Sequence, residues 1–168
     1  MRKLIVCIVL TLTLPNVFGQ ESNNGKKLWA DSFLNKKAPE FTVEGWITPQ
    51  PKMKGKFVLI DFWATWCTPC LKAIPELNEF AKKFKKKLVV IGISNEPADR
   101  VRNMKKPDIE YYSAVDTKGV MMKTLGVNAV PHVILIDPKG IVRWEGYPLL
   151  EGHELTAEII GKIMKKYK

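Results

Sequence analysis

Cys67 and Cys70, three positions apart, are the side chains of this chain best suited to chemistry. The short apolar run 57–62 before them predicts a buried strand, and apolar residues at spacings of three and four over 71–84 predict a helix after them. Two cysteines in the first turn of a helix lie close enough to form a disulfide. The leading cysteine also lies at the positive end of the helix dipole, which favours the thiolate, the species that attacks disulfides. The pattern therefore predicts thiol–disulfide exchange.

The Cys-x-x-Cys spacing also occurs in half of a zinc site, which needs two further ligands. The chain offers Cys7, His132 and His153 for them, and Cys7 lies in a segment that we expect to be removed. An inert structural disulfide would have the same spacing, but such disulfides rarely join the first turn of a single helix. We therefore expect a redox pair that requires neither a metal ion nor a bound cofactor.

The two cysteines have different predicted roles. Cys67 lies nearer the helix start and directly follows Trp66, so we expect it to be the more exposed and more acidic sulfur and the nucleophile. Cys70, one turn deeper, would then resolve the mixed disulfide by attacking Cys67. Thr68 and Pro69 are expected to set the reduction potential, because proline restricts the turn and lacks an N–H, whereas threonine adds no charge.

Residues 61–70 (DFWATWCTPC) resemble the active-site stretch of the thioredoxin superfamily. The match continues over 126–140 (GVNAVPHVILIDPKG), and residues 38–41 and 54–56 resemble the secreted TlpA/ResA-type branch. The resemblance implies an α/β thioredoxin fold, in which helices flank a central mixed sheet, and a thiol–disulfide oxidoreductase activity. We further expect an N-terminal β-hairpin over 41–47.

Asp61 lies six residues before Cys67 in a strand that is otherwise apolar. A carboxylate in such surroundings has a raised pKa and can accept a proton near neutral pH. The resemblance to thioredoxin implies that Asp61 relays protons for the buried cysteine; the alternative is a hydrogen-bonded or partly solvated structural aspartate. Val90 stands where thioredoxin has a lysine, and Ala73 where some secreted reductases have a glutamate. Asp61 is therefore expected to be the only acid close to the pair.

Pro131 marks the second part of the site that the resemblance predicts. The family match implies a cis Val130–Pro131 peptide beside the sulfurs, which would expose the backbone of Val130 for β-type pairing with a substrate. Trp66 is expected to shield the disulfide and to contact the substrate, together with Thr68 and Pro69. Of the histidines, we expect His132 to be partly exposed and His153 to lie on the surface, and we expect the remaining tryptophans to serve in packing.

Strands and helices are predicted to alternate and then to end in a hairpin and a helix, which suits one α/β domain. The predicted strands are 57–62, 88–93, 111–115, 132–136 and 141–145. The predicted helices are 71–84, 97–105, a helix capped by Asp116 or Thr117 and ended by Gly126, and 154–167.

The N-terminus, residues 1–19, has the pattern of a cleavable signal peptide, with a basic pair before the apolar run 4–14 and small residues at the cleavage position. The apolar run is shorter than the roughly 18–20 residues that span a bilayer, so a membrane anchor facing the periplasm is the alternative. We expect a flexible lead over 20–37 and a thioredoxin-like domain over 38–168. The expected location is the periplasm or the outside of the cell.

The formal net charge of +10 comes largely from lysines at 82–87 and 162–168, on the polar faces and ends of predicted helices. Exposed aromatic residues are not interleaved with them, which favours a solvated surface over a nucleic-acid site. The length of 168 residues suits a single domain, which we expect to be a monomer.

Together these features predict an exported oxidoreductase that reduces the disulfides of exported proteins and takes electrons from a membrane thiol donor. Cytochrome c maturation is one role that the resemblance implies. A thiol peroxidase is disfavoured because Ile60 and Ala64 stand where its signature has a proline and a threonine or serine. A disulfide oxidase or isomerase, and a client-binding module without enzyme activity, would also suit the pattern.

Overall fold

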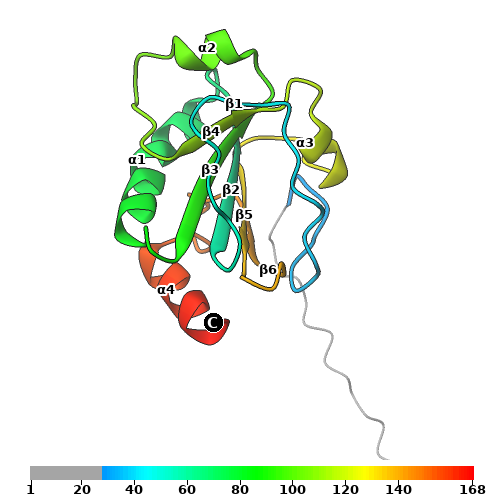
Figure 1. The fold of residues 1–168 in the computed structure, drawn as a ribbon, viewed down its shortest axis with the longest axis vertical. Helices are drawn as coiled ribbons and strands as arrows, with labels where there is room; N and C mark the ends of the chain where they lie inside the picture. Colours follow the sequence, from blue (N-terminus) through cyan, green and yellow to red (C-terminus); the bar gives the residue numbers. More distant parts are fainter. Residues whose placement is uncertain (1–27) are drawn as a thin grey trace, which may run out of the picture.

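The computed structural model describes residues 28–168, whose centre is a six-stranded mixed sheet (Figure 1). The strands lie in the order β1-β4-β3-β2-β5-β6. Strand β2 pairs in parallel with β3 and antiparallel with β5, and these three form the centre of the sheet. The strands are β1 (Gly45–Trp46), β2 (Phe57–Trp63), β3 (Leu88–Ser94), β4 (Tyr112–Val115), β5 (His132–Ile136) and β6 (Val142–Gly146).

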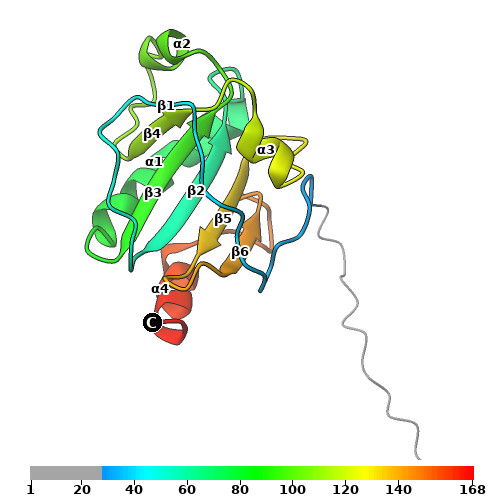
Figure 2. The same cartoon turned by 45° about the vertical axis from the view of Figure 1, so that its right-hand side comes forward.

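Helices cover both faces of this sheet, which confirms the predicted α/β architecture (Figures 1 and 2). Helices α1 and α4 pack against one face, and α3 packs against the other together with the segment before β1. The helices are α1 (Thr68–Lys83), α2 (Ala98–Arg102), α3 (Val120–Thr124) and α4 (Ala157–Lys166). Every residue of β2 and β3 is buried, because both faces of these central strands are covered.

Helix α1 begins where β2 has just ended, so its first turn lies at the end of the central strand. Pro69 is tolerated there because the first N–H groups of a helix have no partner within it. The first turn holds no acidic residue, and Lys82 and Lys83 occupy the last turn, where they complement the helix dipole. The buried face of α1 consists of Cys70, Ala73, Ile74, Leu77 and Phe80. The helix is therefore fixed to the sheet along its whole length, and it holds its N-terminus in place.

Two predicted elements differ from the structure. The expected hairpin over 41–47 is wrong: β1 has two residues and pairs antiparallel with β4, where it satisfies backbone groups of an otherwise open edge. The third helix begins later than its predicted caps, because Gly119 before it has a left-handed φ of 63°. Asp116 still serves that helix, since its Oδ2 accepts a hydrogen bond from the backbone N–H of Met121 at 2.8 Å.

The segment before β1 packs on the domain from its first described residues, so the folded part begins upstream of Ala38. The backbone N–H of Asp31 donates to Leu125, and Lys37 forms an isolated bridge with Ile141 beside β6. The signal peptide expected at 1–19 and the part of the lead at 20–27 lie outside the described residues. Within residues 28–168, the helices are too short or too polar to cross a bilayer.

Candidate active site

Cys67 and Cys70 form a disulfide at the N-terminus of α1, with an S–S distance of 2.00 Å and Cα atoms 5.2 Å apart. Cys67 is the N-cap residue, and its Sγ accepts a hydrogen bond from the backbone N–H of Cys70 at 3.2 Å. The expected difference in exposure is small, since Cys67 is 3% exposed and Cys70 1% exposed. The sulfur nearer the helix end therefore receives an N–H donor directly, the arrangement that stabilises a thiolate when the pair is reduced.

Trp66 precedes the disulfide and is 69% exposed, so this large apolar side chain lies open to a binding partner. Thr68 is also exposed, and Pro69 is half-buried. Trp63, by contrast, is buried in the core, as predicted for a packing residue.

Glu96 holds the loop that leads into the cysteines, a contact that the sequence did not predict. Its buried carboxylate accepts hydrogen bonds from the backbone N–H of Thr65 at 2.6 Å and from the Thr65 hydroxyl at 2.8 Å. The Ser94 hydroxyl donates to the same carboxylate at 3.2 Å, and Arg100 lies 3.6 Å away. Residue 96 thus fixes the backbone two positions before Cys67.

Asp61 is buried in the middle of β2, with 1% exposure. Its Oδ2 accepts a hydrogen bond from the Tyr111 hydroxyl at 3.3 Å, and its Oδ1 has no partner among the described residues. Burial raises the pKa of Asp61 from 3.8 to about 7, against the lowering effect of the Tyr111 hydrogen bond. Burial and the neighbouring Asp61 raise the pKa of Tyr111 well above 10, so its hydroxyl keeps its proton. The carboxyl group of Asp61 can therefore gain or lose a proton near neutral pH.

The face of β2 that carries Asp61 is the one on which α1 packs. Successive side chains of a strand point to opposite faces, so Asp61 shares its face with Leu59 and Trp63, which belong to the same apolar cluster as Cys70. Val90 and Ala73 are both buried apolar residues in that cluster. The carboxylate and the disulfide are thus held in one core.

A groove lies between Pro69, which precedes Cys70, and the cis peptide bond that joins Val130 to Pro131. The pocket has a volume of about 270 Å³ and joins Pro69 of α1 to this peptide. Trp29, expected to serve only in packing, is 53% exposed and lines the groove. Its lining residues are Trp29, Pro69, Ala129, Val130, Pro131, Tyr147 and Leu150. The structure therefore brings Pro69, Val130 and Pro131 together.

His132 differs from its predicted place, whereas His153, which was expected on the surface, is partly exposed. His132 is buried and lies stacked on Phe62, with ring centroids 6.3 Å apart, because β5 is covered on both faces. His153 stacks on Trp144 at 5.0 Å, and its Nε2 lies 3.2 Å from the carbonyl oxygen of Glu145. Within the described part of the chain, groups of three or more His, Cys, Asp or Glu side chains suited to a metal ion are absent.

Comparison with known proteins places the chain among redox proteins. A profile of the AhpC/TSA family matches residues 34–145. The thiol-disulfide oxidoreductase ResA of Bacillus thuringiensis subsp. konkukian is 37% identical over 139 residues, which cover 79% of this chain and 78% of that protein. The thiol:disulfide interchange protein DsbE of Vibrio cholerae is 31% identical over 121 residues, with coverages of 66% and 63%.

Solved structures give the same result. A crystal structure from Chlorobium tepidum, assigned as a thiol:disulfide interchange protein DsbE, matches with a TM-score of 0.64 and 26% identity over 86% of this chain and 100% of that chain. The exposed lipoprotein thioredoxin Etrx1 of Streptococcus pneumoniae matches with a TM-score of 0.56 and 27% identity over 67% and 86%.

A disulfide in the first turn of a helix that follows the central strand of such a sheet defines a thiol–disulfide oxidoreductase with a thioredoxin fold. The chain belongs to the AhpC/TSA family, among its ResA- and DsbE-like thiol–disulfide oxidoreductases.

Proposed function

We propose that this oxidoreductase acts as a reductase of protein disulfides outside the cytoplasm. The observation that carries the proposal is the Cys67–Cys70 pair at the N-terminus of α1, with the buried Asp61 on the sheet face beneath that helix. The helix end stabilises the attacking thiolate of Cys67. The carboxyl group of Asp61, which titrates near neutral pH, can accept the proton of the Cys70 thiol.

In the proposed reaction, the thiolate of Cys67 attacks a substrate disulfide. A bond forms between the Cys67 Sγ and one substrate sulfur, while the second substrate sulfur leaves as a thiolate. Asp61 then takes the proton of Cys70, whose thiolate attacks the Sγ of Cys67 and releases the first substrate sulfur. The enzyme loses two electrons and two protons in all, and the substrate becomes a dithiol. A membrane-bound dithiol donor would reverse these steps and restore the reduced pair.

The groove at Val130 and Pro131 is the proposed binding site for the substrate chain. An extended backbone can pair with Val130 without regard to its side chains, and the exposed Trp66 can cover apolar residues beside the substrate disulfide. Such recognition accepts many sequences. Heme-attachment segments of the form Cys-x-x-Cys-His, as required in cytochrome c maturation, are one substrate class that this groove would accept.

The names of the relatives and the N-terminal sequence support the proposed location. One solved relative is described as an exposed lipoprotein, and residues 1–19 have the composition of a signal peptide. Without that segment the chain would keep two cysteines, both in the active site, and would avoid mispairing in an oxidising compartment.

The reduction potential of the pair tests the direction of the reaction. Equilibration of the protein without residues 1–19 in dithiothreitol and glutathione buffers should give a potential between about −270 and −200 mV. A potential near −120 mV would contradict a reductase and would indicate an oxidase of folding clients.

The mechanism has its own test. Cys70→Ser should accumulate a mixed disulfide between Cys67 and a substrate, and Cys67→Ser should accumulate none and should lose turnover. Clients that remain bound to the double serine variant, with turnover of disulfides unchanged, would instead indicate a binding module.

A further inference from the structure

Tyr111 contacts the functional carboxylate although it lies 50 positions away in the sequence. Its hydroxyl donates to Oδ2 of Asp61 at 3.3 Å, and both residues are buried. The tyrosine precedes β4, which is separated from β2 by the whole of β3, so its ring must extend across β3 to reach the aspartate.

Gly92 provides the space for this ring. In the parallel register of β2 and β3, Gly92 is the direct partner of Asp61. A Cβ atom at position 92 would lie 3.0 Å from Cε2 of Tyr111 and 3.0 Å from Nε1 of Trp63, closer than ordinary van der Waals contact. The absence of a side chain there lets the tyrosine ring lie over the strand and bring its hydroxyl to the carboxylate.

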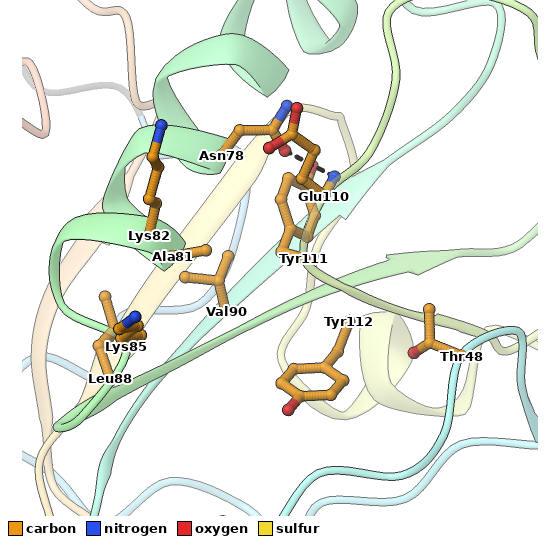
Figure 3. Close-up of a pocket in the computed structure, with 10 residues that line it drawn as sticks. All are labelled: Thr48, Asn78, Ala81, Lys82, Lys85, Leu88, Val90, Glu110, Tyr111 and Tyr112. Atoms are coloured by element: carbon orange, nitrogen blue, oxygen red, sulfur yellow. Dashed lines mark hydrogen bonds between the residues drawn. The ribbon is translucent and has the colours of Figure 1, made fainter.

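Asn78 of α1 fixes the backbone from which Tyr111 extends. Its Oδ1 accepts a hydrogen bond from the backbone N–H of Glu110 at 2.8 Å, and its Nδ2 donates to the carbonyl oxygen of Asp108 at 2.9 Å. Figure 3 shows the first of these bonds at the border of a pocket of about 480 Å³, between α1 and the starts of β3 and β4. Tyr111 lines this pocket and also contacts Asp61, so it lies between the buried acid and a solvent-accessible cavity.

We propose that Tyr111 is a positioning residue for Asp61: its hydroxyl holds Oδ2 and stabilises the carboxylate, and it leaves Oδ1 as the oxygen that exchanges a proton with Cys70. This inference rests on the proton-accepting role of Asp61 proposed above. It assigns the two carboxylate oxygens different tasks, which agrees with the hydrogen-bonded state of one and the unpartnered state of the second among the described residues.

The side chains around Asp61 indicate that Tyr111 is the neighbour with the most direct effect on its pKa. Among the described residues, Tyr111 is the titratable side chain that is hydrogen-bonded to Asp61, and the two cysteines belong to the same cluster. Ser113, the register partner of Gly92, is a buried polar side chain in the same row across the sheet. The apolar side chains of the cluster include Leu59 and Trp63 from β2, Val90 from β3, Val133 and Leu135 from β5, Trp144 from β6, Ala73, Ile74 and Leu77 from α1, and Ile160 and Met164 from α4. Removal of the Tyr111 hydroxyl should therefore change the pKa of Asp61 mainly through the loss of this one hydrogen bond.

The sign of the effect follows from the hydrogen bond. The tyrosine donor favours the ionised carboxylate and lowers the pKa of Asp61, so Tyr111→Phe should raise it. Asp61 must be ionised to accept the proton of Cys70. The variant should then resolve mixed disulfides with a pH profile whose midpoint lies about one pH unit higher, the size expected for one hydrogen bond to a charged group.

The experiment compares wild type, Tyr111→Phe, Tyr112→Phe and Asp61→Asn. Carboxyl ¹³C NMR of the oxidised proteins, in which the cysteines do not titrate, reports the pKa of Asp61 directly. Single-turnover reduction of insulin disulfides by the reduced proteins, followed against pH, reports its role in the reaction.

Tyr112 is the matched control, because it lines the same pocket, is exposed, and has no bond to Asp61 among those of the described residues. Gly92→Ala is a second way to disturb this contact, because its new methyl group would crowd the Tyr111 ring as well as Trp63.

The expected result is an upward shift of both the NMR titration and the turnover profile in Tyr111→Phe and Gly92→Ala, with Tyr112→Phe unchanged. A profile that Asp61→Asn flattens but Tyr111→Phe leaves in place would overturn the role of Tyr111 and keep that of Asp61. A profile that Asp61→Asn does not alter would overturn both, whereas trapping of mixed disulfides by Cys70→Ser would still hold. Thermal unfolding of each variant separates these outcomes from a loss of fold.

Discussion

Asp61 destabilises the fold that contains it whenever it is ionised. Its pKa in the folded state is about 7, raised by burial from an ordinary value of 3.8. The folded protein therefore holds this proton more tightly than the unfolded chain, and the free energy of unfolding falls as the pH rises from about 4 to about 7. An acid retained at such a cost is typical of a functional position.

Asp61→Asn should remove this cost. We expect the free energy of unfolding at pH 8 to rise by up to about 4 kcal/mol, because about three pH units separate the folded and unfolded pKa values. The gain should shrink as the pH falls below 7 and vanish near pH 4, where the wild-type carboxyl is protonated in both states. Urea unfolding of the oxidised proteins at pH 8 and pH 4 measures it. An equal gain at both pH values would show that charge is not its cause.

The two tryptophans near the disulfide should separate binding from stability. Trp66 is exposed, so Trp66→Ala should leave the free energy of unfolding within about 0.5 kcal/mol of wild type while raising the KM for protein disulfides. Trp63 is buried, and Trp63→Ala should cost about 3–5 kcal/mol through the cavity it leaves. Denaturation and steady-state kinetics on both variants check this pair. An unchanged KM in the Trp66 variant would exclude a substrate contact.

The candidate site was predictable where its residues are neighbours in the sequence. Cys67, Cys70 and Asp61 lie within ten positions, and their placement on a strand and a helix follows from local patterns. Tyr111 and Glu96 reach the site through pairing of β2 with β3 and of β3 with β4. Local residue spacing does not indicate which residues far apart in the sequence will be neighbours in the sheet. These two contacts could therefore be identified only in the folded structure.

At the scale of elements, the loop between β2 and α1 depends on β3 for its shape. Glu96 follows β3 and accepts the N–H and hydroxyl of Thr65, so one carboxylate joins the ends of two adjacent strands. The position of the Cys67 thiolate thus depends on a residue 29 positions later in the chain.

Glu96→Gln should loosen this loop. The amide keeps one acceptor oxygen where the carboxylate has two, and it removes the negative charge that strengthens both bonds from Thr65, so we expect a loss of about 1–3 kcal/mol in the free energy of unfolding. The rate of attack by Cys67 should fall as well, because its approach to substrate is less well fixed. Glu151→Gln, at an exposed position, is the control. Stopped-flow reaction of the reduced proteins with a small disulfide measures the rate, and equal rates in the two variants would contradict the inference.

Elements with a continuous pattern were predicted more closely than those set by tertiary pairing. Strands β2 and β3 extend only one residue beyond their predicted ends. The prediction was close because central strands, which are buried on both faces, are nearly continuous apolar runs. The prediction of a hairpin at 41–47 was wrong because the alternation of side chains along a strand does not indicate which strand will pair with it. Helix α2 covers Ala98–Arg102 rather than 97–105, and no side chain caps its start.

For the whole molecule, the segment before β1 completes the core rather than leading into it. Glu145 of β6 is buried, and its carboxylate accepts hydrogen bonds from the Ser32 hydroxyl at 2.5 Å and the Phe33 N–H at 2.8 Å. These donors come from a stretch that the sequence suggested was a flexible lead, because its polar composition held no sign of a buried partner.

A chain that starts at residue 38 should therefore be less stable than one that starts at residue 28. The shorter chain lacks both donors to the Glu145 carboxylate and also the core contacts of Ala30 and Phe33, and we expect a loss of about 3–5 kcal/mol. Adding Glu145→Gln to the shorter chain should recover part of it, because a neutral amide is less costly to bury. Urea unfolding of the three proteins gives the comparison, and equal stability of the two starting points would contradict it.

The segment before β1 also limits where incompletely folded chains can bind. The proposed reductase would work among such chains, whose free strands pair with open sheet edges. Here β4 is bordered by β1, and β6 is bordered at its start by the backbone of residues 35–38. In the function proposed above, clients would thereby be directed to the groove at Val130 and Pro131, where an encounter ends in exchange and release. They would be kept away from the borders of the sheet, where an encounter would end in aggregation.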